Sequence, residues 1–101
     1  MALSGKTALI TGASKGLGKA MALALSNSGA AIALVARDAG KLTGVRDEIA
    51  SAGGTAKVFV ADVTQEDQVS RLKTQVAAEM GRVQILINSA GINIRKNLID
   101  F

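Results

Sequence analysis

The chain has 101 residues, 49% of them hydrophobic, and its 12 basic and 8 acidic side chains give a formal net charge of +4. This length and composition predict one small domain, residues 1–101, with a hydrophobic core. The chain has no cysteine and no histidine, which excludes disulfides, thiolate nucleophiles and the commonest metal ligand and general base, so we expect no metal site.

The first predicted element is a buried strand of a parallel sheet over Thr7-Ala8-Leu9-Ile10, a largely apolar run. A glycine-rich turn follows it, and a helix is expected over about Gly16 to Asn27, with Gly29 as a left-handed cap. The spacing of four apolar residues predicts the buried face of this helix: Leu17, Met21, Ala24 and Leu25.

A second strand, buried on both faces, is predicted over Ala30–Ala36, where every residue is apolar. The helix after it ends at Gly53-Gly54, and a third strand is expected over Thr55–Ala61. The apolar face of that helix consists of Leu42, Val45 and Ile49. The third strand is less apolar and carries Lys57, which is typical of a sheet edge that a lysine protects from pairing.

The third helix is expected to begin at a capping box, Thr64-Gln65-Glu66-Asp67, with an acidic side chain in the third helical position. Its apolar face and its end are marked by Val69, Leu72, Val76, Met80 and Gly81. A fourth strand is predicted over Val83–Ile87. The rest of the chain, through Phe101, is expected to be loop with the start of another helix.

This βαβαβαβ order predicts an α/β fold, a doubly wound parallel sheet of the Rossmann type with strand order 3-2-1-4. Right-handed crossovers then place the first two helices on one face and the third on the other. The strand order reverses between strands one and four, and ligands bind beyond the carboxyl ends of strands at such a point. The glycine turn and the segment Asn88–Gly91 lie at these two ends, so we expect the binding site there.

The turn Thr11-Gly12-Ala13-Ser14-Lys15-Gly16-Leu17-Gly18 joins a strand to a helix, the context in which backbone N–H groups and a helix dipole hold a phosphate. Its glycine order differs from the G-x-G-x-x-G fingerprint. It also misses the P-loop pattern, because the gap before Gly18-Lys19 is one residue too long and Ala20 lacks the hydroxyl that binds Mg²⁺. We therefore do not expect a nucleotide triphosphatase, although the glycines alone leave open a turn without a ligand.

The turn matches the pattern T-G-x-x-x-G-x-G, and with it the chain resembles the short-chain dehydrogenase/reductase family. Three further features stand in register: Arg37 after the second strand, Asp62-Val63 after the third, and Asn88-Ser89-Ala90-Gly91 after the fourth. The last departs from the family's N-N-A-G at Ser89, which loses an amide. The resemblance covers all 101 residues but only the N-terminal part of the family, so the domain is expected to be truncated.

The resemblance implies a cofactor-binding role for these residues. The backbone around Gly12, Gly16, Leu17 and Gly18 would hold a pyrophosphate, and Ser14 and Lys15 of the same turn would also bind the cofactor. Asp62 would accept a hydrogen bond from the adenine amino group beside the Val63 N–H, with capping of a local turn as its alternative role. Asn88 would tie strands one and four together, and Ala90 and Gly91 would leave room for a ribose.

The end of the second strand indicates which dinucleotide is bound. NAD enzymes place an acid there to bind the ribose 2′-hydroxyl, whereas this chain has Ala36 followed by Arg37, and Lys15 lies inside the glycine turn. A 2′-phosphate between Arg37 and Lys15 would receive charge-assisted hydrogen bonds, which favours NADP(H). Asp38 is assigned as the N-cap of the next helix, and the alternative for Arg37 is a solvated loop charge.

The family's chemistry uses a tyrosine, a lysine four residues later, and a supporting serine and asparagine, all beyond the fourth strand. The chain contains no tyrosine, so no catalytic residue is assigned to it. We expect the N-terminal, cofactor-binding portion of an NADP(H)-dependent oxidoreductase that transfers hydride between the dinucleotide and a small carbonyl or alcohol substrate. The alternatives are a stand-alone nucleotide-binding module and a non-catalytic fragment that self-assembles.

The remaining expectations concern surroundings and partners. The apolar run Ala30–Ala36 is too short for a bilayer span of roughly 20 residues, and the N-terminus lacks the apolar region of a signal peptide, so we expect a cytoplasmic protein without membrane contact. Scattered basic residues and only two aromatic side chains argue against nucleic-acid binding. Apolar side chains of strands one and four are expected to meet water, and the edge at Ile85–Ile87 is expected to drive self-association.

Overall fold

The computed structural model describes residues 1–89, which form a four-stranded parallel sheet with three helices. The strands are β1 (Thr7–Thr11), β2 (Ala31–Ala36), β3 (Thr55–Val60) and β4 (Ile85–Asn88), and the helices are α1 (Gly16–Asn27), α2 (Ala39–Ser51) and α3 (Glu66–Met80). The strand order is β3-β2-β1-β4. The predicted doubly wound sheet is confirmed, and strand ends differ from the predicted ones by one or two residues.

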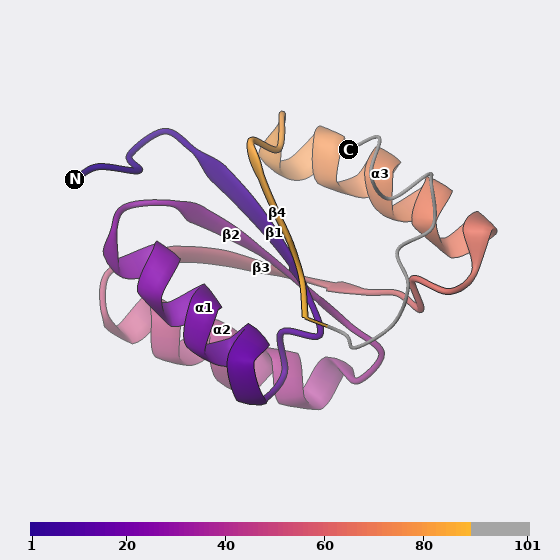
Figure 1. Cartoon of the computed structure of the whole chain (residues 1–101), viewed down its shortest axis with the longest axis horizontal. Helices are drawn as coiled ribbons and strands as arrows, with labels where there is room; N and C mark the ends of the chain where they lie inside the picture. Colours follow the sequence, from indigo (N-terminus) through magenta and orange to yellow (C-terminus); the bar gives the residue numbers. More distant parts are fainter. Residues whose placement is uncertain (90–101) are drawn as a thin grey trace.

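The helices lie in two layers, with α1 and α2 on one face of the sheet and α3 on the other (Figure 1). β1 shows how one strand serves both layers: Ala8 and Ile10 pack in the core under α1 and α2, whereas Leu9 packs in the core under α3. All three side chains are 0% exposed. Burial on both faces explains why β1 and β2 are apolar without alternation.

The buried face of α1 differs from the predicted one. Leu17 is 69% exposed and Ala24 is also exposed, while Met21 and Leu25 are half-buried. The fully buried positions of the helix are Gly18, Ala22 and Ser26. These small residues, spaced by four, let the helix backbone approach the sheet closely. Apolar periodicity predicted the wrong stripe because close approach selects small side chains rather than hydrophobic ones.

The other two helices bury the predicted faces. The buried residues are Leu42, Val45 and Ile49 on α2 and Val69, Leu72 and Val76 on α3, with Met80 packed at the edge of the second core. Asp38 caps α2 as predicted, because its Oδ1 accepts a hydrogen bond from the Lys41 N–H at 3.2 Å. The predicted capping box of α3 is wrong: the N-cap is Gln65, without a side-chain cap, and the Thr64 hydroxyl donates to Asp62 instead.

The two outer strands of the described sheet are β3 and β4. Lys57 is exposed on β3, as predicted for an edge, and its Nζ lies 3.8 Å from Glu79 Oε1. On β4, Ile85–Ile87 are half-buried. The expectation that strand one meets water is wrong, because Leu9 is 0% exposed and belongs to the same buried cluster as Leu72 and Val76 of α3. None of the helices within residues 1–89 combines the length and apolar character that crossing a membrane requires.

Candidate functional site

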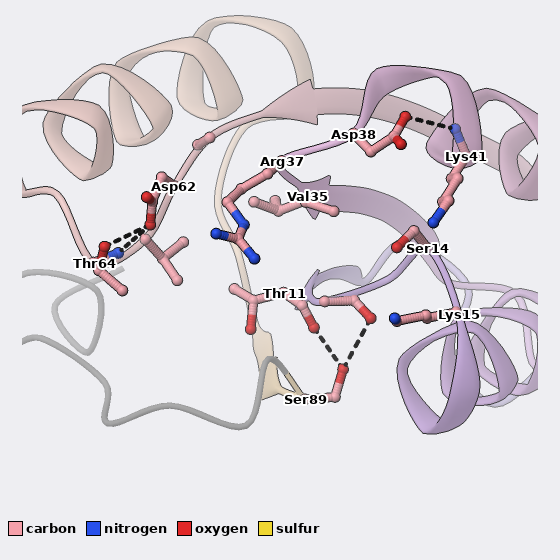
Figure 2. A pocket seen from close by; sticks show the side chains of 14 residues that line it. Thr11, Ser14, Lys15, Val35, Arg37, Asp38, Lys41, Asp62, Thr64 and Ser89 are labelled. Atoms are coloured by element: carbon pink, nitrogen blue, oxygen red, sulfur yellow. Dashed lines mark hydrogen bonds between the residues drawn. The ribbon is translucent and has the colours of Figure 1, made fainter.

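A cavity of about 370 Å³ opens at the carboxyl ends of the strands, beside the glycine turn (Figure 2). This is the end of the sheet at which the strand order reverses between β1 and β4. Its lining residues are Thr11, Gly12, Ser14, Lys15, Val35, Ala36, Arg37, Asp38, Lys41, Ala61, Asp62, Val63, Thr64 and Ser89. The predicted location of the binding site therefore coincides with a real cavity.

The glycine turn leaves the start of α1 open. Gly12 and Gly16 have φ angles of 65° and 59°, which side chains rarely adopt, and Lys15 at the N-cap makes no side-chain cap. The first intrahelical bond runs from the Lys19 N–H to the Lys15 carbonyl. The N–H groups of residues 16–18 consequently have no acceptor within residues 1–89, and they add to the positive end of the helix dipole.

Gly18 holds α1 against the turn. A Cβ at this position would collide with the Gly12 carbonyl oxygen and with Ser89 Oγ. Ser89 fastens the same place from β4, since its hydroxyl donates to the Thr11 carbonyl at 2.5 Å and lies 3.4 Å from the Gly12 carbonyl oxygen (Figure 2). The serine that replaces the family's asparagine thus bonds the turn directly.

Asn88 joins β4 to β1, as predicted. Its Oδ1 accepts a hydrogen bond of 2.7 Å from the Thr11 hydroxyl, and the two residues are register partners in the parallel ladder. The pairing fixes the carboxyl ends of β1 and β4 side by side below the cavity. Ala90 and Gly91, the expected ribose neighbours, lie outside the described residues.

Three cations line the cavity: Lys15 from the turn, Arg37 from the end of β2 and Lys41 from the first turn of α2 (Figure 2). Within residues 1–89 none of them lies in an ion pair, in contrast to Lys19, which pairs with Glu48 at 3.0 Å. The Asp38 carboxylate lines the same cavity but serves as the cap of α2. Positive charge at this end of the site is thus left without an ion-pair partner.

Asp62 lies across the cavity and forms a tight local turn. Its Oδ1 accepts hydrogen bonds from the Thr64 hydroxyl at 2.6 Å and from the Thr64 N–H at 3.0 Å. These bonds lower the pKa of the Asp62 carboxyl below its ordinary value. Burial raises the pKa by a smaller amount, and the positive charge of Arg37 adds a minor lowering effect. The capping role, left as the alternative from sequence, is therefore present, and Oδ2 makes no hydrogen bond within residues 1–89.

The structure brings most of the predicted site residues together. Six of them line the cavity: Gly12, Ser14, Lys15, Arg37, Asp62 and Val63. Gly16, Leu17, Gly18 and Asn88 do not line it; they build the turn and the strand end beside it.

Lys41 and Thr64 are two of the lining residues to which sequence reasoning gave no part in the site. Lys41 stands three residues after the helix cap Asp38, which places it in the first helical turn at the same end of the sheet. Thr64 stands two residues after Asp62, the spacing of an Asx turn. Both signals were readable in the sequence once the helix starts were known.

A doubly wound sheet with an uncapped helix start at its switch point is the architecture of a dinucleotide-binding domain. The chain belongs to the short-chain dehydrogenase family, whose model matches residues 6–101. The family binds a nicotinamide dinucleotide and acts on small molecules.

Individual relatives agree with this assignment. The chain is 41% identical over 98 residues to a short chain dehydrogenase of Pseudocercospora fijiensis, covering 97% of this chain and 32% of that protein. It is 39% identical to a gluconate 5-dehydrogenase of Gluconobacter oxydans, covering 98% of this chain and 39% of that protein. A metagenomic short-chain oxidoreductase solved in complex with NADP superposes with a TM-score of 0.87 at 42% identity, over 91% of this chain and 42% of that one. The chain thus spans about a third of the length of the curated relatives that it matches.

Proposed function

We propose that this chain is the NADP(H)-binding portion of an oxidoreductase that transfers hydride between the dinucleotide and a carbonyl or alcohol. The observation that carries the proposal is the positive charge of Arg37, at the end of β2, and of Lys15, in the glycine turn, in the cavity where an acid would select NAD(H). The relative solved with NADP supports the same cofactor class. The nicotinamide would supply the hydride, and the residues of this chain would hold and orient the dinucleotide.

The start of α1 fits a pyrophosphate. α2 is capped by Asp38, and α3 has Glu66 and Asp67 in its first turn, so both carry an acid where the helix dipole is positive. α1 has no acid in its first turn and no side-chain cap, and Lys15 adds a positive charge there. An anion at residues 16–18 would accept hydrogen bonds from the open N–H groups. It would also offset the repulsion between the Lys15 charge and the positive end of the helix dipole.

The Asp38 carboxylate does not replace the missing acid. Its Oδ1 accepts the Lys41 N–H and so is engaged in starting α2. A ribose diol that used both oxygens of this carboxylate would compete with the cap, whose loss costs a helix about 1 kcal/mol. Arg37 stands next to it, and a guanidinium binds a phosphate through two parallel hydrogen bonds. This neighbourhood therefore favours a 2′-phosphate over a free 2′-hydroxyl.

The opposite end of the cavity is suited to adenine. Asp62 keeps Oδ2 available while Thr64 holds Oδ1, so that the carboxylate has one fixed orientation. Its lowered pKa keeps it ionised at neutral pH and able to accept a hydrogen bond from an exocyclic amine. The Val63 residue beside it is 6% exposed and forms an apolar wall.

Calorimetric titration of the 101-residue chain with NADP⁺ and NAD⁺ tests the proposal. NADP⁺ is expected to bind more tightly, and Arg37→Asp should weaken NADP⁺ binding by about 10- to 100-fold, because one to two charge-assisted hydrogen bonds of about 1.5 kcal/mol each are lost. Arg82→Asp is the matched control, since Arg82 is exposed at the amino end of β4, away from the cavity. Equal affinities for the two dinucleotides in the unmutated chain would refute the assignment.

We also propose that the 101-residue chain self-associates through β4. This strand is the outer strand of the described sheet beside β1, and Ile85–Ile87 are only partly covered. An apolar strand with an open edge pairs readily with another chain. Light scattering is expected to show a dimer or larger species. A compact monomer at high concentration, without surface that binds an apolar dye, would contradict this proposal.

A further inference from the structure

The basic side chains within residues 1–89 differ in whether they form ion pairs. Four of them lie in ion pairs with carboxylates: Lys19, Arg46, Lys57 and Arg71. Five others have no ion pair or side-chain hydrogen bond within residues 1–89: Lys6, Lys15, Arg37, Lys41 and Arg82. Three of these five line the cavity at the carboxyl ends of the strands. Unpaired cations thus gather where a ligand would supply the missing negative charge.

Lys41 is the member of this group that sequence reasoning did not identify. Its backbone is fixed, because its N–H donates to Asp38 Oδ1 at 3.2 Å and starts α2. Its side chain extends from the helix toward the glycine turn, on the side of Ser14 and Lys15 (Figure 2). The cap of α2 therefore also determines where this ammonium group enters the site.

Lys41 and Arg37 approach the cavity from either side of Asp38. Arg37 follows β2 and offers a planar, two-pronged donor, whereas Lys41 offers a compact charge that can reorient. A phosphomonoester is a dianion near neutral pH with three acceptor oxygens, so one cation leaves it only partly neutralised. Two cations on opposite sides, with a hydroxyl at Ser14, therefore suit a phosphomonoester dianion better than a pyrophosphate oxygen, which carries a single negative charge.

We infer that Lys41 is a specificity residue of this cavity, which binds a phosphomonoester on the ribose of an adenine nucleotide. The inference rests on the proposed function, because it adds Lys41 to Arg37 and Lys15 at the same end of the site. The chemistry is shared by the 2′-phosphate of NADP(H) and the 3′-phosphate of coenzyme A, and the positions are distinguished by the probes below. Lys41 would act with Arg37 and would leave the pyrophosphate at the start of α1 unaffected.

The test uses the 101-residue chain and three probes: adenosine 2′,5′-bisphosphate, adenosine 3′,5′-bisphosphate and 5′-AMP. Lys41→Met keeps the aliphatic stem and removes the charge. It is expected to weaken binding of the 2′,5′-bisphosphate about tenfold, as for one charge-assisted hydrogen bond, and to change 5′-AMP binding less than about twofold. Lys41→Arg should retain most of the affinity, and the loss in Lys41→Met should shrink with added salt because the site is exposed.

Lys6→Met is the matched control. Lys6 is also exposed and without an ion pair, but it lies before β1 at the amino ends of the strands. It makes the same change in net charge and is expected to leave all three affinities unchanged. If Lys6→Met weakens the 2′,5′-bisphosphate as much as Lys41→Met does, the effect is a general field effect and the inference fails. Circular dichroism of both variants shows whether they remain folded.

The outcomes separate this inference from the proposed function. If Lys41→Met binds the 2′,5′-bisphosphate as tightly as the unmutated chain while Arg37→Met does not, Lys41 has no such role and the NADP(H) assignment stands. If the unmutated chain binds both bisphosphates equally and Lys41→Met weakens both, the role of Lys41 stands and the NADP(H) assignment falls. If the unmutated chain does not distinguish the bisphosphates from 5′-AMP, both ideas are overturned.

Discussion

Gly18 gives the sharpest test of how the glycine turn and α1 are held together. In Gly18→Ala the added methyl group would meet the Gly12 carbonyl oxygen and Ser89 Oγ, and it would lie 2.9 Å from the Gly12 carbonyl carbon. Two of these atoms belong to the backbone, so they cannot move aside by a side-chain rotation. Overpacking of this kind costs about 1–3 kcal/mol, against a gain of at most about 1 kcal/mol in helix propensity.

The chain offers an internal control in Gly44, which lies in the middle of α2. A Cβ at Gly44 has nothing within 4 Å, so Gly44→Ala should gain about 0.5–1 kcal/mol from propensity alone. Denaturant unfolding should therefore move the midpoint down for Gly18→Ala and up for Gly44→Ala. Thermal midpoints should shift in the same directions, by about 4–8 °C per kcal/mol for a domain of this size.

Gly18→Ala is expected to affect dinucleotide binding as well as stability, and titration measures the effect on binding. Gly18→Ala should also weaken dinucleotide binding, because the turn must move away from the helix start whose N–H groups we assign to the pyrophosphate. Equal stability of Gly18→Ala and Gly44→Ala, with unchanged dinucleotide binding, would show that the turn is not packed against α1 as described.

Two further predictions follow from the same site. Because hydrogen bonds from Thr64 lower the pKa of Asp62 in the folded chain, the carboxylate stabilises the fold above its unfolded pKa of about 3.9, and this contribution is lost as the pH falls through the lower folded value. Asp62→Asn should consequently lower the thermal midpoint at pH 7 and approach the unmutated chain near pH 2; a constant difference across this range would contradict the assignment. The purified 101-residue chain should not oxidise NADPH with a panel of ketones, because it contains no tyrosine, histidine or cysteine to relay the proton, and absorbance decay that survives repurification would disprove this.

Local interactions made several features of this protein readable from the sequence. The order of strands and helices follows from apolar runs and periodic faces, which are signals within single segments. The cap Asp38 acts on a group three residues away, so its role was visible without knowledge of the fold. The glycine turn was likewise assigned from its position between a strand and a helix. The strand order followed from the doubly wound pattern of alternating strands and helices, and the handedness of crossovers then placed the helices on the two faces.

Only the tertiary structure decided which surfaces meet. The face of α1 that packs on the sheet carries Gly18 and Ser26 rather than Leu17, because close approach between backbones depends on the partner and not on hydrophobicity. Strand one proved to be buried on this face because Leu9 shares a core with residues of α3, which is distant in sequence.

The same distinction explains the site. The sequence predicted Thr64 as part of a helix cap, but its hydroxyl donates a hydrogen bond to Asp62 instead. Lys15 comes from the turn after β1, whereas Arg37 and Lys41 come from the end of β2 and the first turn of α2, so the three share a cavity only after β1 and β2 pair. A sequence specifies the donors and charges of each segment, whereas their convergence depends on strand register and on contacts between residues far apart in the chain, which no local pattern records.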